Sequence, residues 1–223
     1  MKNGIGKLIG VSAAGLFCMT LSAWAGAGDL SKQVLTKVEP VAPLFTEDRI
    51  EFQAMQGALF SQNDIGPSIP TYDYAKTTLR LGWMLDTPAG DGSWYDGNFE
   101  AVMEISTNFV FSGFGNVHVG PTGLVRYNFV QPGWKVVPYV QGGAGIVYSD
   151  GYQTSSQRAL GGCIEFTPQA GVGIRCLLNN NWSVDLEADF EHISNAGIYS
   201  RNLGVNAIGG QVGFSYFFDR LWQ

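Results

Sequence analysis

The sequence predicts an all-β fold, namely an eight-stranded antiparallel transmembrane β-barrel of the outer membrane. Only 14% of the 223 residues are charged, against about a quarter in soluble domains, and 13% are aromatic. Segments of about ten residues alternate between apolar and polar side chains, which is typical of strands with one face in lipid. After the N-terminal leader, no apolar run is long enough to form a membrane-spanning helix.

Residues 1–25 have the organisation of a secretory signal peptide. Lys2 and Lys7 give a positive start, residues 8–21 are mostly apolar, and Ala-Trp-Ala offers small residues at the two positions that a signal peptidase reads. We therefore expect cleavage after Ala25 and export of the mature chain.

The remaining chain divides into a lead-in and a barrel. Residues 26–48 have no clear period and contain two prolines, so we expect an extended periplasmic lead-in to a barrel over 49–223. Breaks rich in glycine, proline, aspartate and asparagine separate the alternating segments. The eight expected strands are 49–61, 74–85, 97–112, 116–130, 134–149, 166–178, 182–194 and 206–218.

The alternation is clearest in the last two expected strands. In 206–218 the large apolar residues share one face, and glycines, Gln211 and Ser215 share the other. In 182–194 the apolar face is opposed by Asp185, Glu187, Asp189 and Glu191. A row of carboxylates cannot face hydrocarbon without great cost, so this face must point into the barrel.

The same parity predicts a charged interior elsewhere in the barrel. The other residues expected to point inward are Glu51, Glu100, Glu104, Asn108, Arg80, Arg126 and Arg175. Because an eight-stranded barrel is just wide enough for side chains to fill it, we expect an ion-paired core and no pore. We interpret the carboxylates as structural and not as metal ligands, since arginines are present to pair with them.

Strand order also predicts orientation. If the mature N-terminus is periplasmic, the seventh strand ends at the extracellular leaflet, and the longer connections 62–73, 150–165 and 195–205 are outer loops. The connection 86–96 is long for a periplasmic turn, and 113–115 is short for an outer loop.

Charge and cysteines limit the function further. Loss of Lys2 and Lys7 with the leader leaves 11 Lys and Arg against 19 Asp and Glu, which argues against a nucleic-acid binder. Cys163 and Cys176 remain in the exported chain, and both a disulfide and two unpaired thiols are open readings.

The chemistry gathers at the end of the seventh strand. His192 and Ser194 are two residues apart and therefore share a face, which by parity is the lipid side. A histidine can take the proton of a serine nucleophile, and Asn195 can supply an oxyanion donor. A polar rim in an ordinary barrel would explain the same two residues. We expect the other histidine, His118, to be a rim residue of the fourth strand.

The surrounding sequence points to a family. The stretch 192–197 (His-Ile-Ser-Asn-Ala-Gly), with 202–207 and the strand end 214–218, resembles the C-terminal signature of the acyloxyacyl hydrolase family of PagL-type lipid A 3-O-deacylases. Residues 138–145 and 166–173 resemble the preceding strands of that family. The resemblance implies an outer-membrane barrel that removes the ester-linked hydroxyacyl chain at the 3-position of lipid A, without a metal or other cofactor.

Carried onto this sequence, the resemblance makes His192 the general base, Ser194 the nucleophile and Asn195 an oxyanion-hole contributor. The orienting glutamate of the family corresponds to Asn206, which can hold an imidazole but cannot stabilise imidazolium by charge. Lipopolysaccharide of the outer leaflet is the implied partner, and the apolar lipid face is compatible with a homodimer.

Two alternatives stay open at this point. The chain could be a non-catalytic small outer-membrane barrel with a structural or surface-binding role, or a related phospholipid acyl hydrolase. The cluster of His192, Ser194 and Asn195 favours an enzyme, because a structural barrel has no need of it. The motif alone does not distinguish one lipid substrate from another.

Overall fold

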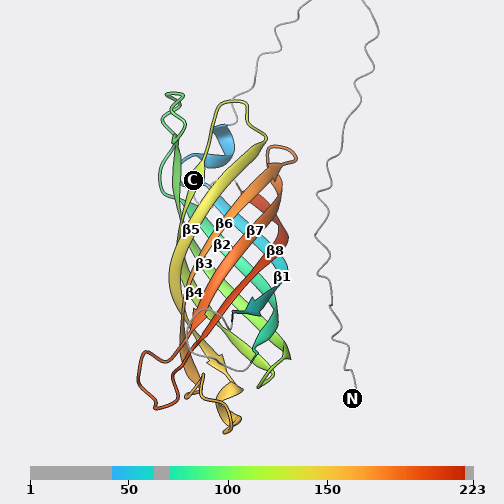
Figure 1. Cartoon of the computed structure of the whole chain (residues 1–223). Helices are drawn as coiled ribbons and strands as arrows, with labels where there is room; N and C mark the ends of the chain where they lie inside the picture. The colour runs from blue at the N-terminus through green and yellow to red at the C-terminus, as the bar shows by residue number, and fades with distance from the viewer. Residues whose placement is uncertain (1–41, 63–70, 219–223) are drawn as a thin grey trace, which may run out of the picture. The chain divides into compact units, whose positions relative to one another are not determined.

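The computed structural model describes residues 42–62 and 71–218. The expected signal peptide and residues 26–41 of the expected lead-in lie outside them. Eight antiparallel strands follow one another around a closed barrel in which β1 pairs with β8 (Figure 1). Within the described ranges, no helix is long and apolar enough to cross a bilayer.

The strand bounds follow the predicted segments closely. They are β1 Ile50–Ser61, β2 Asp73–Met84, β3 Gly97–Ser112, β4 Val117–Phe129, β5 Val136–Ser149, β6 Ile164–Leu177, β7 Trp182–Ile193 and β8 Val205–Phe218. Two short 3-10 turns, η1 (Ala42–Phe45) and η2 (Gly151–Gln153), lie outside the strands. The eight-stranded barrel fold is thereby confirmed.

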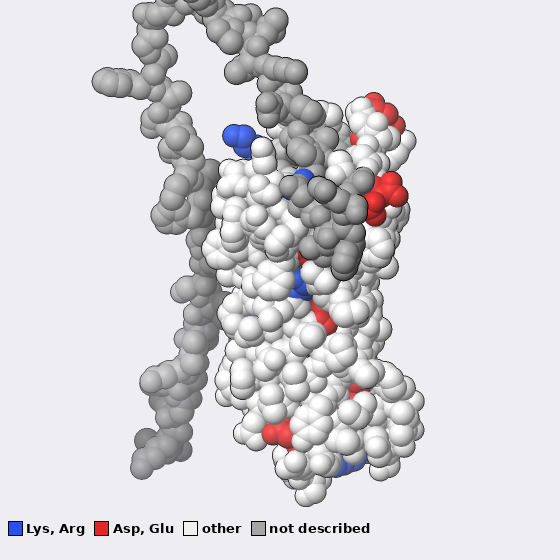
Figure 2. Space-filling view, turned by 180° about the vertical axis from the view of Figure 1, so that it is seen from behind, with Lys and Arg blue, Asp and Glu red and all other residues white. Residues whose placement is uncertain are grey.

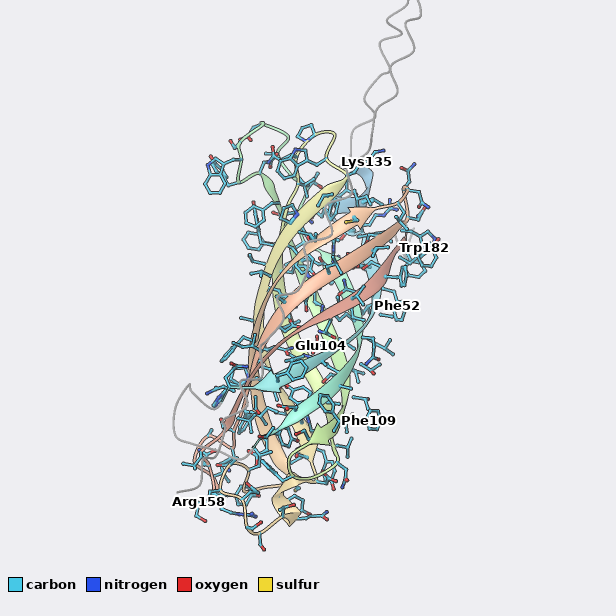
Figure 3. The ribbon with its side chains drawn as sticks, turned by 45° about the vertical axis from the view of Figure 1, so that its right-hand side comes forward. Phe52, Glu104, Phe109, Lys135, Arg158 and Trp182 are labelled. Atoms are coloured by element: carbon cyan, nitrogen blue, oxygen red, sulfur yellow. The ribbon has the colours of Figure 1, made fainter. Side chains whose placement is uncertain are left out.

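The outer wall is apolar, as the alternation predicted. Leu81 and Trp83 on β2 are each 52% exposed, whereas Arg80, on the other face of the strand, is 2% exposed. Figure 2 shows a surface of mostly uncharged side chains between the two ends. In Figure 3, Phe52 and Phe109 lie outside the strands and Glu104 lies within them. Lipid therefore contacts one face of each strand and the packed interior contacts the other.

The middle of the interior is an ion-paired layer, which we call the ionic core. Arg80 on β2 contacts Glu104 on β3 and Glu187 on β7, each at 2.7 Å. Arg126 and Arg175 both contact Glu51 and Glu100. The predicted pairing of inward acids with arginines is thus confirmed.

Glycine makes room for these groups. A Cβ atom on Gly82 would lie 1.9 Å from Glu100 Oε1, so only glycine allows that carboxylate its place in the core.

Two apolar clusters close the ionic core at its ends. The η1-end plug consists of Leu44, Phe45, Met84, Val130, Val137 and Phe217. The loop-end plug consists of Leu59, Tyr72, Tyr74, Phe114, Val147, Ala159, Leu160, Ile193, Val205 and Ala207. The loop-end plug lies beside the connections 150–163 and 194–204, at the bottom of Figure 1. Water is thus kept from the buried ion pairs at both ends of the barrel.

Two features of the interior were not predicted. Lys76 lies fully buried, with Nζ 2.9 Å from Glu191 Oε2, although its parity with Arg80 could have placed it there. The turn η1 sends Leu44 and Phe45 into the barrel mouth, and Phe45 packs edge-on against Phe217. Two apolar residues in a row have no period, so the sequence carried no signal for this plug.

Candidate active site

The candidate site lies where β7 ends and β8 begins, on the outer wall. His192 and Asn206 are direct cross-strand partners on neighbouring strands. Both are half-buried and share the lipid-facing side with Phe190 and Ile208, which form the next pair along that face. The position agrees with the parity that the sequence predicted.

His192 and Asn206 are in direct contact. Nδ1 of His192 lies 2.6 Å from Oδ1 of Asn206. A carbonyl oxygen can only accept, so the ring donates its Nδ1–H and leaves the Nε2 lone pair available. An imidazole held in this tautomer is prepared to take a proton at Nε2.

Ser194 is the first residue after β7, and its backbone is held by the neighbouring strand. Phe166 N–H donates to Ser194 O at 2.7 Å, and Ser194 N–H donates to Phe166 O at 3.1 Å. The side chain is half-buried, and its Oγ has no hydrogen-bond partner among the described residues. The structure therefore brings His192 to Asn206 and leaves the Ser194 hydroxyl without a hydrogen bond to the ring. Such bonds often tighten only when substrate binds.

Asn195 organises the turn that follows. Its Nδ2 donates to Arg201 O at 2.8 Å, and its Oδ1 accepts from Gly197 N–H and Tyr199 N–H. Its backbone N–H donates to Asn202 Oδ1 at 2.8 Å. The donors that sequence analysis assigned to the oxyanion are thus engaged within the loop, and the oxyanion role of Asn195 stays a prediction.

Gly204 is a site residue that sequence analysis missed. Its φ of +73° lies in the left-handed region, and a Cβ atom there would be 2.8 Å from Cε1 of His192. The bare backbone therefore fits against the imidazole ring that Asn206 holds at Nδ1. The available signal was a glycine two residues before Asn206, since glycine is the residue that readily adopts a positive φ.

The loop that carries Gly204 is fastened to the loop between β5 and β6. Leu203 N–H donates to Arg158 O, and Gly204 N–H donates to Ala159 O, each at 3.1 Å. The guanidinium of Arg201 donates to two further carbonyls of that loop, Tyr152 O at 2.6 Å and Thr154 O at 2.9 Å. The shape of the site therefore depends on two loops.

From the site toward the middle of the barrel, the outer wall is hollowed. The cross-strand pairs run from His192–Asn206 through Phe190–Ile208 to Ala188–Gly210, so a bulky pair is followed by a small one. A shallow groove centred on the small pair is bounded by Val172, Ile174, Leu186 and Val212. Its apolar surface runs along the same strands that carry the site.

His118 lies elsewhere, and the expectation of a rim residue was wrong. It is fully buried inside the barrel, with Nδ1 3.2 Å from Tyr72 OH and Nε2 3.8 Å from Glu191 Oε1. Its parity with Arg126 on the same strand was the signal that pointed inward. It faces away from the lipid side on which His192 lies.

The two cysteines are unpaired, which resolves the open alternative. Cys163 precedes β6 and Cys176 lies near the far end of the same strand. A strand rises about 3.3 Å per residue, so they are far beyond the Cα separation of about 7 Å that a disulfide allows.

Comparisons with known proteins identify the family and the fold. The family profile described as "Lipid A 3-O-deacylase (PagL)" matches residues 77–215. The crystal structure of the outer membrane enzyme PagL is similar at a TM-score of 0.51 and 20% identity, covering 73% of this chain and 97% of that one. The N-terminal β-barrel domain of Pseudomonas aeruginosa OprF has a TM-score of 0.49 and 16% identity, covering 77% and 98%. A comparison with curated protein sequences finds no match.

The structural likeness describes the fold, and the profile covers more than half of the chain, including His192 and Asn206. The chain therefore belongs to the PagL family of lipid A 3-O-deacylases.

Proposed function

We propose that this barrel hydrolyses the ester at the 3-position of lipid A with Ser194 as nucleophile, His192 as general base and Asn206 as orienting group. The observation that carries the proposal is the 2.6 Å contact between His192 and Asn206 on the lipid-facing wall. A soluble substrate would not require a base that faces the bilayer. Family membership supports the reaction, and the membrane barrel supports the location of its substrate.

The reaction proceeds in two steps. Ser194 Oγ attacks the acyl carbonyl carbon while its proton passes to His192 Nε2. The tetrahedral intermediate collapses, the bond between the acyl carbon and the sugar's 3-oxygen breaks, and the sugar leaves with its 3-hydroxyl protonated by His192. Water then attacks the acyl-enzyme and loses a proton to His192. His192 passes that proton to Ser194 Oγ as the acyl–Oγ bond breaks, which releases the hydroxy fatty acid and restores Ser194. No metal or other cofactor enters either step.

Asn206 holds the imidazole in its reactive tautomer without supplying a charge. An orienting glutamate or aspartate would also stabilise the imidazolium that forms during each step. Asn206 therefore orients His192 but stabilises its protonated form less than a carboxylate would. We expect turnover to be slower than with an acid at this position.

The oxyanion assignment of Asn195 requires one exchange. The Asn195 N–H is the first amide after Ser194 and now donates to the neutral oxygen of Asn202. A negatively charged oxygen is the stronger acceptor, so the developing oxyanion would replace that oxygen in the transition state.

The groove between the site and the middle of the barrel suits an acyl chain. Its Ala188–Gly210 floor and apolar sides lie on the same strands, beyond the Phe190–Ile208 pair, so an acyl chain would cross that pair to reach the groove from the site. The homodimer that the apolar face is compatible with stays a prediction.

The direct test is expression in the outer membrane of a host with ordinary lipid A, followed by mass spectrometry of that lipid A. The wild type is expected to remove one hydroxyacyl mass, and Ser194→Ala is expected to remove none. Ser200→Ala, in the same loop and exposed, is the matched control and is expected to retain activity. Unchanged lipid A with a folded wild-type barrel would reject the proposal. Loss of a phospholipid acyl chain instead would favour the related phospholipase.

A further inference from the structure

Most charged side chains at the loop end form hydrogen bonds within the loops. Asp150 accepts from Asn116 and Val117 amides, Glu165 accepts from Gly161 and Gly162 amides, and Arg201 donates to loop carbonyls. Asp73 accepts from Ser61. Within residues 42–62 and 71–218, Arg158 is the one charged residue at this end that is exposed, and no hydrogen bond or ion pair of its guanidinium is found there.

Arg158 is carried next to the candidate site by rigid backbone. Its carbonyl accepts from Leu203, and the following carbonyl, of Ala159, accepts from Gly204. Gly204 in turn lies against the His192 ring. Ala159 and Leu160 are completely buried in the loop-end plug, so the segment cannot shift without opening that plug. Figure 3 shows Arg158 beyond the ends of the strands, away from the apolar wall.

This placement suits the chemistry of a phosphorylated glycolipid. Lipid A carries phosphate on the same glucosamine disaccharide that bears its ester-linked chains, and the phosphates lie at the water-facing edge of the leaflet. A guanidinium presents paired N–H groups that match phosphate oxygens, and it is weakly hydrated for a cation. The guanidinium of Arg158 has no partner among the described residues, and Arg158 lies beside the proposed catalytic residues, so its guanidinium has the chemistry to bind that group.

We propose that Arg158 binds a phosphate group of the lipid A headgroup and so positions the 3-ester at Ser194. The proposal rests on the proposed function for its choice of substrate. Arg158 acts on binding and takes no part in proton transfer, so its removal is expected to raise KM and leave kcat nearly unchanged.

The test measures binding in the Ser194→Ala background, where no turnover occurs. The purified barrel is titrated with bisphosphorylated lipid A and with the same lipid after enzymatic dephosphorylation. Arg158→Ala is expected to weaken binding of the phosphorylated lipid about tenfold, to leave the dephosphorylated lipid unaffected, and to reduce the salt dependence of binding. Arg158→Lys is expected to bind the phosphorylated lipid with an affinity between those of the parent and of Arg158→Ala, because it keeps the charge and loses the paired donors.

Lys135 provides the matched control, since it is an exposed cation at the opposite end of the barrel. Lys135→Ala is expected to bind both lipids as the parent does. Equal binding of the phosphorylated lipid by Arg158→Ala and its parent would overturn the proposal. An equally large effect of Arg158→Ala on vesicles containing phosphatidylglycerol would also overturn it, because the arginine would then recognise anionic lipid in general.

This readout separates the two proposals. If the wild type leaves lipid A intact but Arg158-dependent binding persists, the phosphate site stands and the hydrolytic function fails. If the wild type deacylates and binding does not depend on Arg158, the hydrolytic function stands and the phosphate site fails.

Discussion

The two faces of β7 differ in where they place polar side chains. On the inner face, Glu187 and Glu191 are each matched by a buried cation, Arg80 or Lys76. On the outer face, Phe190 and Leu186 meet lipid, and polar groups appear only at the end of the strand, as His192 and then Ser194. Inside the barrel, ion pairs join carboxylates on β7 to cations on β2. On the outer face of β7, the polar side chains are confined to the strand end, where the proposed reaction takes place.

The largest effect is expected on the inner face. Arg80→Met leaves Glu104 and Glu187 buried without their shared partner, which costs about 3–5 kcal/mol of unfolding free energy. The measurement is urea-induced unfolding in detergent micelles. Leu81→Met, one residue away on the lipid side, is expected to change stability little. Adding Glu187→Gln to Arg80→Met is expected to restore part of the loss, and no restoration would mean that the ion pair is not the cause.

The next effect belongs to the outer face and should leave stability alone. Asn206→Ala removes the acceptor for His192 Nδ1–H and is expected to lower kcat about 10²-fold, because the tautomer is no longer held. Asn206→Asp keeps the acceptor, adds a charge and is expected to raise kcat above that of the wild type. Initial rates of deacylation on lipid A in mixed micelles decide the matter. Wild-type rates in Asn206→Ala would exclude it from the site.

A smaller effect is expected from alanine substitutions at two loop glycines, which separate backbone strain from displacement of the His192 ring. Gly204 and Gly197 both have positive φ, of +73° and +84°, so alanine strains the backbone at either position by about 1–2 kcal/mol. A Cβ at Gly204 also meets His192, whereas nothing lies within 4 Å of a Cβ at Gly197. Gly204→Ala is therefore expected to lower kcat about tenfold further than Gly197→Ala does. Equal rates for the two variants would show that the contact does not position the ring.

The smallest effect concerns pH and the loop end. Partial burial raises the pKa of Asp150, but hydrogen bonds from the Asn116 and Val117 amides outweigh it, and the net pKa is lowered. A carboxyl with a lowered folded pKa stabilises the fold above its unfolded pKa, about 3.9, and loses that contribution as pH falls through the folded value. Asp150→Asn is expected to flatten the acid side of the stability curve by less than about 1 kcal/mol. Unfolding midpoints between pH 3 and 7 test this, and an unchanged slope would contradict it.

The fold could be predicted because lipid and a packed interior impose a period of two on every strand. The acids of β7 alone were enough to choose the inner face, and the same parity correctly placed Arg80, Arg126 and Arg175. Lys76 and His118 obeyed that parity as well and were missed only because it was not applied to them.

The candidate site was predictable only in part. Parity placed His192 and Ser194 on the lipid side, and the family resemblance supplied Asn206 as the partner of His192. Asn206 lies on the next strand, at a register that the sequence does not display. Gly204 against the ring, and Arg201 across two loops, depend on loop conformations set by tertiary contacts, so no local pattern could reveal them.

The ionic core has a consequence for assembly. Some of its contacts join strands that are not neighbours in the sheet: Arg80 on β2 contacts Glu187 on β7, and Arg126 on β4 contacts Glu51 on β1. In a partly formed sheet, Arg80 would have Glu104 without Glu187, and Arg126 would have Glu100 without Glu51. The complete set of ion pairs therefore requires a closed barrel, and we expect the early strands to complete their pairing only when the last strands arrive.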